Sequence, residues 1–418
     1  MKTYNLQDSL RNKISLYHLI LFLMLLPFDR FYSEIVVISF VLHTFIHVDK
    51  HKLLHALNWQ TVVLSSVFLL SIAGLIWSAD KKEGLQGVEH QLVILLFPLT
   101  LSVSGLNLVR YKQKLLLLFA ATCIATILYL YADAIGIILY HHLPLDTLIS
   151  PAFLNHHFSA PIGMHATYLS MYVSLSIASL LYCFLRTNTK TNRLWLVLGM
   201  ITLLTGLLQL GSKSVLIASF LFFIPGFASL LPKGMRRKLF IAVILAVLLT
   251  TTLAITKIEP LKERYVAEMK QDMGNVSIHN KILEPRIIRW QSALPSIARN
   301  PVIGYGSGSE KKLLKEIYFE NKLYNSYLHE LDIHNQYLSF LIKNGIIGLL
   351  IFLATLYAGF RLAWRNKDAV FTSFMTLISI VSFSENILDV NKGIFFYAFF
   401  FSLFMITGKN NAAKKNIT

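Results

Sequence analysis

Charged residues and cysteine are both scarce in this sequence. Asp, Glu, Lys and Arg make up 15% of the 418 residues, whereas 55% are hydrophobic; an ordinary soluble domain has about 25% charged residues. A chain of this composition cannot bury its apolar surface in one aqueous core, so we predict an all-α, polytopic membrane protein. The two cysteines, Cys123 and Cys183, lie within apolar runs, which argues against a disulfide framework or a cysteine metal site.

Metal-binding motifs are also lacking. The sequence contains no Asp-x-Asp, which argues against a metal-bridged nucleotide-sugar site on the cytoplasmic face. His329 and Glu330 precede His334, but the spacing is His-Glu-x-x-x-His, whereas two zinc-binding histidines need positions i and i+4 to share a helical face. We therefore expect neither a metal ion nor another cofactor.

Basic residues are in excess, and their positions argue against a nucleic-acid partner. The formal net charge is +17, but the cations form short clusters between apolar runs, which is the pattern that encodes membrane topology. A spanning helix needs about 20 mostly apolar residues, and the sequence offers twelve candidate segments. They lie near residues 14–28, 32–48, 61–77, 86–104, 114–140, 165–185, 194–210, 214–231, 238–256, 336–360, 369–386 and 393–408.

The distribution of cations predicts how these spans are oriented. With the N-terminus in the cytoplasm, the inner segments hold 21 Lys and Arg residues and the short outer segments hold 5. Because basic residues are enriched on the cytoplasmic side, we predict cytoplasmic N- and C-termini in a bacterial inner membrane. Arg11 and Lys13 precede the first apolar run without a small-residue cleavage pattern, so this run is expected to be a retained span.

Residues 257–334 form a segment of 78 residues without a membrane-length apolar run, and they are predicted to face the periplasm. Loops of this length are uncommon unless they are functional or disordered, and Trp290 with regularly spaced Leu, Ile and Tyr favours order. We expect helices near 260–271, 285–299 and 310–321. The chain then divides into residues 1–256 with nine spans, a periplasmic loop at 257–335 carrying the catalytic motifs, and residues 336–418 with three spans and a cytoplasmic tail.

Two arginines in this loop are candidates for binding phosphate. Arg286, Arg289 and Trp290 stand at positions i, i+3 and i+4, so they share one helical face. Arginine binds phosphate bidentately with fixed geometry, which suits a lipid pyrophosphate. The alternative is an interfacial helix whose arginines contact lipid headgroups or Glu284.

His334 and Asn335 begin the tenth apolar segment at its outer end. A histidine there can be neutral near pH 7 and can accept a proton from a sugar hydroxyl. Asn335 is suited either to orienting a ligand or to capping the helix. The alternative for the pair is a plain helix cap with a solvated imidazole.

Further polar residues are predicted at the same face. Lys213 lies between two spans near the outer boundary, either as a third cation for the same anion or as a lysine that extends to the headgroups. The turn containing Gly304 and Gly306 is either an ordinary turn or a source of backbone N–H groups for a phosphate.

Two span ends add to this set. His165 and Tyr168 begin the sixth segment and Glu385 ends the eleventh. These residues either line a polar site or simply mark the ends of spans.

Four motifs in this order resemble the O-antigen ligase and polymerase superfamily, whose members are bacterial inner-membrane enzymes. The resemblance extends to the twelve-span layout, the large periplasmic loop after the ninth span and the motif around Lys213. Its specific residues lie between about 160 and 390. The motifs are Arg286-x-x-x-Trp290, Pro301-x-x-Gly304-x-Gly306, His334-Asn335-x-x-Leu338 and Gly345-x-x-Gly348.

The resemblance implies transfer of a glycan from undecaprenyl pyrophosphate to an acceptor, without metal or nucleotide. In ligases the acceptor is a sugar of the lipid A core; polymerases and protein O-oligosaccharyltransferases are alternatives within the superfamily. It implies that Arg286 binds the pyrophosphate, that His334 acts at the acceptor hydroxyl and that Lys213 is a further cation. Lys213 stands where many members have arginine, and Lys343-Asn344 replaces the acidic residue often found before Gly345.

A polysaccharide flippase or transporter is the rival from another functional class. A transporter of this kind has polar residues at mid-membrane depth and pseudo-repeated broken spans. Here most polar residues lie at one predicted face and no clear internal repeat is present, which favours an enzyme. The expected partners are a lipid-linked glycan donor that enters from the bilayer, a lipid A core or other glycan acceptor, and membrane lipids.

Overall fold

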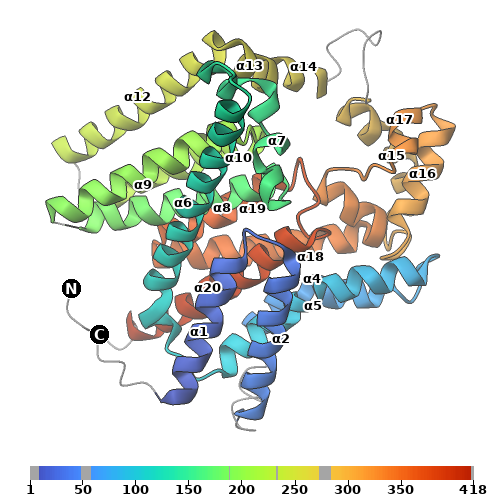
Figure 1. The fold of residues 1–418 in the computed structure, drawn as a ribbon. Coiled ribbons are helices and arrows are strands. Elements are labelled where there is room, and N and C mark those ends of the chain that lie inside the picture. The colour runs from blue at the N-terminus through green and yellow to red at the C-terminus, as the bar shows by residue number, and fades with distance from the viewer. Residues whose placement is uncertain (1–8, 49–57, 188, 232–233, 273–283, 416–418) are drawn as a thin grey trace.

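The structure is a computed structural model that describes residues 9–48, 58–187, 189–231, 234–272 and 284–415. Within these ranges all regular secondary structure is helical, as predicted (Figure 1). The helices that coincide with the predicted apolar segments are α1 (Leu10–Leu25), α2 (Arg30–Ile46), α4 (Trp59–Gly74), α5 (Lys81–Val103), α6 (Leu108–Tyr140), α8 (Ala166–Arg186), α9 (Lys190–Gln209), α12 (Met235–Lys257), α18 (Gln336–Asn366), α19 (Ala369–Val381) and α20 (Asn391–Lys415).

The eighth apolar segment is not one regular helix. It starts as α10 (Lys213–Ile217), continues as a π-helix over Ala218–Phe223, and ends in α11 (Ile224–Phe227) and a 3-10 turn over Ala228–Leu230. Widened π-helical turns occur frequently at functional sites, and this interruption begins one helical turn after Lys213.

Seven of the described helices are long and apolar enough to cross a membrane, by length and composition. Two further apolar helices, α4 and α19, are shorter. The number of such helices supports a polytopic membrane protein. The seven are α5, α6, α8, α9, α12, α18 and α20.

Helix α20 lies at the centre of the bundle, and α12 lies at its periphery (Figure 1). In the membrane-length part of α20, 89% of the residues are buried inside the protein, whereas in that of α12 only 6% are buried. Phenylalanines explain the difference: the ring of Phe400 on α20 lies 4.8 Å from that of Phe119 on α6, and Phe399 lies 5.2 Å from Phe22 on α1. Tilted aromatic pairs of this kind fix α20 against its neighbours.

Three helices of the predicted periplasmic segment form a small domain at one end of the bundle (Figure 1). They are α15 (Arg286–Arg299), α16 (Glu310–Glu320) and α17 (Tyr324–Leu328), and they enclose their own apolar core, which includes Ala293, Leu314 and Tyr318. A second group follows α12, namely α13 (Glu259–Lys262), a π-helical turn over Glu263–Ala267 and α14 (Glu268–Asp272). These elements agree with the helices predicted near 260–271, 285–299 and 310–321.

The loop between α15 and α16 docks into a break in α18. Gly345 has φ +60° and ψ −157°, so the helical hydrogen bonds are interrupted there. The amides of Tyr305 and Gly306 donate to the carbonyls of Ile342 and Lys343, each at 2.8 Å, and the amide of Ile346 donates to the carbonyl of Pro301 at 2.8 Å. The loop thus satisfies backbone groups that the break leaves without helical partners.

Candidate functional site

Arg286 occupies the first position of α15 and points at the turn between α19 and α20. Its Nη1 atom donates to the carbonyl of Ser384 at 2.7 Å, and its Nη2 atom lies 3.7 Å from Glu385 Oε1. Glu284, the alternative partner considered from the sequence, instead accepts hydrogen bonds from the amides of Asn325 and Ser326. The Arg286 side chain is 28% exposed, so the guanidinium remains accessible to a ligand.

His334 lies directly before α18 in a left-handed conformation, with φ +47°. Such a conformation is uncommon for a residue with a Cβ atom and is held only by specific surrounding contacts. Its amide donates to Asp332 Oδ1 at 2.9 Å. Its imidazole Nδ1 lies 3.3 Å from Glu385 Oε2 and 3.3 Å from Asp332 Oδ1.

Glu385 joins these two residues. One carboxylate oxygen faces Arg286 and also accepts from Thr167 Oγ1 at 3.5 Å, while the other faces His334. Burial alone would raise the pKa of Glu385, but the hydrogen bond from His334 and the charges of His334 and Arg286 hold that pKa below its ordinary value. The carboxylate is therefore ionised at neutral pH and contacts both side chains.

The other two predicted residues on the shared face of α15 hold the segment before His334. Arg289 Nη1 donates to the carbonyl of Asp332 at 3.0 Å, and Trp290 Nε1 donates to the carbonyl of Ile333 at 2.9 Å. Arg289 is 4% exposed. The Arg289 guanidinium lies inside the small domain, where burial lowers its pKa, and it holds the backbone of the segment before His334. Its contact with the substrate stays a prediction.

Asn335 has the role of a helix cap. Its side-chain oxygen accepts from the amides of Tyr337 and Leu338 at 3.0 and 3.2 Å, and its own amide donates to Asn386 Oδ1 at 2.8 Å. With 5% exposure, it is enclosed by protein. Of the two predicted roles, capping α18 is the one that the geometry supports, and substrate binding by Asn335 stays a prediction.

In the glycine turn, the amides of Gly306, Ser307 and Gly308 are hydrogen-bonded within the protein. The amide of Gly306 is bonded to Lys343, the amide of Ser307 donates to the carbonyl of Gly74, and the amide of Gly308 donates to Ser78 Oγ. The positive φ angles of Gly304 (+64°) and Gly306 (+94°) let the chain approach α18 and the α4–α5 turn closely. The contact of Gly304 and Gly306 with a ligand stays a prediction.

A buried ion network that sequence reasoning missed lies beside Glu385. Lys343 Nζ is 2.9 Å from Glu310 Oε2 and 2.8 Å from Asp389 Oδ1, and Ser339 Oγ donates to Glu310 Oε2 at 2.5 Å. This network ties α16 and α18 to the α19–α20 turn. A lysine inside an apolar run was the available signal, because a charge at that depth requires a partner.

His165 caps the start of α8 beside the same cluster. Its Nδ1 accepts from the amide of Thr167 at 3.3 Å, and its ring lies 4.1 Å from that of His156, centroid to centroid. Burial lowers the pKa of His165, although Glu385 opposes the shift. Tyr168 is 3% exposed, and its ring lies 5.5 Å from that of His165, centroid to centroid, in a tilted arrangement. Its contact with a ligand stays a prediction.

Lys213 is near this cluster but is paired with other carboxylates. Its Nζ atom lies 3.4 Å from Glu268 Oε2 and 3.5 Å from Asp272 Oδ2. The neighbouring Ser214 accepts a hydrogen bond from Ser384, Oγ to Oγ, at 2.8 Å, and Ser384 is the residue whose carbonyl binds Arg286. The serine pair thus connects Arg286, which binds the Ser384 carbonyl, to Lys213, which precedes Ser214 in the chain.

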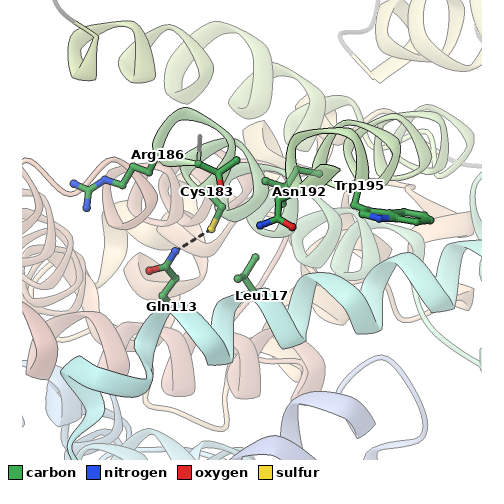
Figure 2. Close-up of a pocket in the computed structure, with 8 residues that line it drawn as sticks. Gln113, Leu117, Cys183, Arg186, Asn192 and Trp195 are labelled. Atoms are coloured by element: carbon green, nitrogen blue, oxygen red, sulfur yellow. Dashed lines mark hydrogen bonds between the residues drawn. The ribbon is translucent and has the colours of Figure 1, made fainter. Parts of the chain in front are cut away.

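A separate pocket lies at the other end of α8, between α6, α8 and α9 (Figure 2). The side-chain amide of Gln113 donates to the sulfur of Cys183 at 3.4 Å, and Arg186 is among the residues that line the pocket (Figure 2). Because α8 rises about 1.5 Å per residue, this pocket is about 30 Å from His165 and takes no part in the cluster around His334. Burial of the Cys183 thiol suits a structural contact.

The cluster combines a proton acceptor with fixed cations. A carboxylate at one imidazole nitrogen leaves the other nitrogen available as a base, and Arg286 beside it can hold an anion. In the part of the chain that the structure describes, no group of three or more His, Cys, Asp or Glu is placed to bind a metal ion.

Comparison with known proteins identifies this region. Residues 198–353 match the family model described as O-antigen ligase. The matched region contains Lys213, Arg286 and His334, and it confirms the resemblance to the O-antigen ligase and polymerase superfamily. Glu385 and His165 lie outside the matched region but are brought to it by the fold. No curated protein matches the chain in the corresponding search.

Together these findings indicate a membrane protein with an O-antigen ligase region. Members of this family are membrane enzymes of the glycosyltransferase type that act on lipid-linked glycans. The apolar helices described above are consistent with that setting.

Proposed function

We propose that the protein is an O-antigen ligase-type glycosyltransferase. It moves a glycan from undecaprenyl pyrophosphate to a hydroxyl of the lipid A core at the periplasmic face of the bacterial inner membrane. The observation that supports the proposal is the sharing of Glu385 by His334 and Arg286, two residues that lie within the range matched by the O-antigen ligase family model. The residue that removes the proton and the residue that binds the leaving group then contact the same carboxylate.

His334 acts as the general base. Glu385 accepts the hydrogen bond from Nδ1–H, so Nε2 carries the lone pair that takes the proton of the acceptor hydroxyl. The acceptor oxygen forms a bond to the anomeric carbon as the bond from that carbon to the pyrophosphate oxygen breaks. In-line attack opposite the leaving group inverts the anomeric centre. The ionised Glu385 stabilises the imidazolium that forms, as the carboxylate does in a Ser-His-Asp triad.

Arg286 binds the departing pyrophosphate. Negative charge develops on the bridging oxygen as the bond breaks, and a cation fixed in advance stabilises that charge without reorganisation. Lys213 contributes a second positive charge from α10. Pyrophosphate is a good leaving group once it is neutralised, so this mechanism requires no metal ion and no nucleotide.

The finer topology is part of the proposal. All twelve apolar segments span the membrane, both termini are cytoplasmic and residues 257–335 are periplasmic. The excess of Lys and Arg on one set of loops supports this arrangement. The small domain of α15, α16 and α17 then lies at the periplasmic end of the bundle, with its cluster open to a lipid-linked donor that enters from the bilayer.

The lipopolysaccharide of a deletion strain distinguishes ligase from polymerase. A ligase-deficient strain loses all polymer on the core and accumulates long lipid-linked chains. Cores bearing a single repeat would instead identify a polymerase, in which the acceptor is another lipid-linked repeat. Unaltered lipopolysaccharide with loss of glycan from periplasmic proteins would identify a protein O-oligosaccharyltransferase. Cores without polymer, with unprocessed lipid-linked glycan retained in the cytoplasmic leaflet, would favour a flippase.

A further inference from the structure

The turn after α9 brings together three segments that are distant in sequence. The last carbonyls of a helix have no hydrogen-bond donor within the helix. At the end of α9, other segments of the chain supply these donors. Tyr265 Oη donates to the carbonyl of Leu208 at 3.0 Å, and the amide of Asn155 donates to the carbonyl of Gln209 at 2.9 Å. Arg264 Nε donates to the carbonyl of Gly211 at 3.2 Å. Arg264 is thereby fixed at Gly211, which lies two residues before Lys213 in the chain.

Arg264 and Lys213 share a carboxylate. Glu268 is ion-paired with both side chains through Oε2, and Asp272 adds a second contact to Lys213 at 3.5 Å. Among the residues that the structure describes, Gly211 and Glu268 are the only hydrogen-bond partners of the Arg264 guanidinium, which leaves its Nη2 edge unused. Two cations are therefore held close together with unused donor capacity.

The exposure of these four side chains is unequal. The cations are mostly buried, at 18% for Lys213 and 23% for Arg264, whereas the carboxylates are more open, at 40% for Glu268 and 42% for Asp272. Burial lowers the pKa of Lys213, while Asp272 and Glu268 oppose that shift. The cations are thus fixed by protein, and the carboxylates lie on the solvent side, where they can rotate into water without being desolvated.

A polar path leads from this pair to the cluster at His334. His156 follows Asn155, the residue docked on Gln209, and its ring lies 4.1 Å from that of His165. On another side, Ser214 is bonded to Ser384, whose carbonyl accepts from Arg286. The first link ends at His165, whose protonated form is favoured by the charge of Glu385, and the second ends at Ser384, the residue before Glu385. Both links therefore connect the Arg264–Lys213 pair to Arg286 and Glu385.

We propose that Arg264 and Lys213 together bind one phosphate of the donor's pyrophosphate, and that this phosphate displaces Glu268 and Asp272. Arg286 binds the other phosphate. This inference rests on the proposed function, because it takes a lipid pyrophosphate as the ligand. Lysine contributes a point charge, whereas the planar guanidinium of Arg264 contributes the two-pronged donor set that fits phosphate oxygens. In the free protein Glu268 and Asp272 are ion-paired with the cations, and these ion pairs break when the donor binds.

The test compares two lipids on the purified full-length protein in nanodiscs. Undecaprenyl pyrophosphate and undecaprenyl monophosphate are titrated onto the wild type, Arg264→Gln, Glu268→Gln and the double variant. Wild type is expected to bind the pyrophosphate more tightly. Arg264→Gln is expected to weaken that binding roughly tenfold or more, as loss of a charged hydrogen bond does, and to reduce the preference over the monophosphate.

Glu268→Gln gives the outcome of opposite sign. Removing the competing carboxylate is expected to tighten pyrophosphate binding, and the gain is expected to be smaller in the double variant, where Lys213 is the only cation of the pair that remains to be freed. If the ion pair between Arg264 and Glu268 were purely structural, Glu268→Gln would not tighten pyrophosphate binding. Lys262→Gln is the matched control, since Lys262 is a nearby lysine paired with Glu259 at 3.2 Å and is 49% exposed; its binding is expected to equal that of wild type.

The outcomes separate the two proposals. If wild type binds the pyrophosphate but Arg264→Gln keeps both its affinity and its lipid preference, or if Glu268→Gln binds no more tightly, the role of Arg264 is overturned while the proposed function stands. If wild type shows no saturable binding of the pyrophosphate, both proposals are overturned. Should Arg264→Gln fail to insert at normal levels, the sign of the Glu268→Gln effect decides.

Discussion

The Nδ1 atom of His334 and the Oε2 atom of Glu385 lie 3.3 Å apart, although 51 positions separate the two residues in the chain. One belongs to the segment before α18 and the other to the turn after α19. Arg286 reaches the same carboxylate from α15. Because both residues contact the same carboxylate, a small shift of the α19–α20 turn disturbs the proposed base and the anion-binding arginine together.

Replacing Glu385 by glutamine is expected to lower the turnover of glycan transfer by about a hundredfold or more, the usual size of a general-base contribution. Glutamine keeps the shape of the side chain but cannot stabilise the imidazolium of His334. Donor binding is expected to change much less. Transfer and binding are both measured on the purified protein, and a turnover equal to wild type would remove Glu385 from the mechanism.

Asp332→Asn is the matched control for that variant. Asp332 lies as close to His334 Nδ1 as Glu385 does, but its Oδ1 atom also accepts from the His334 amide, a bond that asparagine retains. The Asp332 side chain is 44% exposed, so water screens its charge. A small loss for Asp332→Asn beside a large loss for Glu385→Gln is expected; the reverse order would assign the orienting role to Asp332.

Arg286→Lys is expected to fail nearly as badly as Arg286→Ala. The guanidinium makes two separate contacts, with the Ser384 carbonyl and with Glu385, and a lysine point charge cannot reproduce that fork. Loss of a contact to the developing anion typically costs about 3–4 kcal/mol, which is measured as the change in kcat/KM. Arg299→Lys, at the exposed last turn of α15, is the control and is expected to behave as wild type.

Gly345→Ala is expected to destabilise the protein, because the break in α18 leaves no room for a side chain. A Cβ atom there would lie 2.3 Å from the carbonyl of Val302, and the positive φ adds backbone strain of about 1–3 kcal/mol. Thermal unfolding in detergent measures the effect. Gly136→Ala is the control, since its Cβ would meet nothing within 4 Å on α6; an unchanged midpoint for Gly345→Ala would contradict the docking of the loop.

The proposed topology is tested by alkaline phosphatase fusions, because that enzyme is active only outside the cytoplasm. A fusion after Gln271 is expected to be active and a fusion after Arg236 inactive. The reasoning is the excess of Lys and Arg on the segments assigned to the cytoplasm. The opposite pattern would invert the whole arrangement and place the cluster around His334 in the cytoplasm.

Features that depend on local sequence were predictable. Pro285 followed by Arg286 and Trp290 marks the start of a helix and the face that its side chains share, and α15 begins at Arg286. Asn335 before an apolar run indicates a cap, which the structure contains. The apolar runs indicated where helices lie, because a run of this composition has few other stable conformations in lipid.

Features that depend on long-range packing were not predictable. Gly304 and Gly306 suggested a phosphate-binding turn, but the break at Gly345 exposes carbonyls that take up the amides of this turn. Periodicity placed Arg289 on the same face as Arg286, and only the packing of α15 on the segment before His334 decides that one is buried and the other accessible.

The central claim is that His334 is the base, and transfer by His334→Ala tests it most directly. The purified variant, shown to insert at wild-type levels, is given saturating undecaprenyl-pyrophosphate-linked glycan and lipid A core acceptor in excess EDTA. The account predicts that wild type remains active under these conditions and that His334→Ala loses about a hundredfold or more in turnover, with donor affinity nearly unchanged. Transfer by His334→Ala at the wild-type rate would contradict the account and leave His334 as a residue that only precedes the cap of α18.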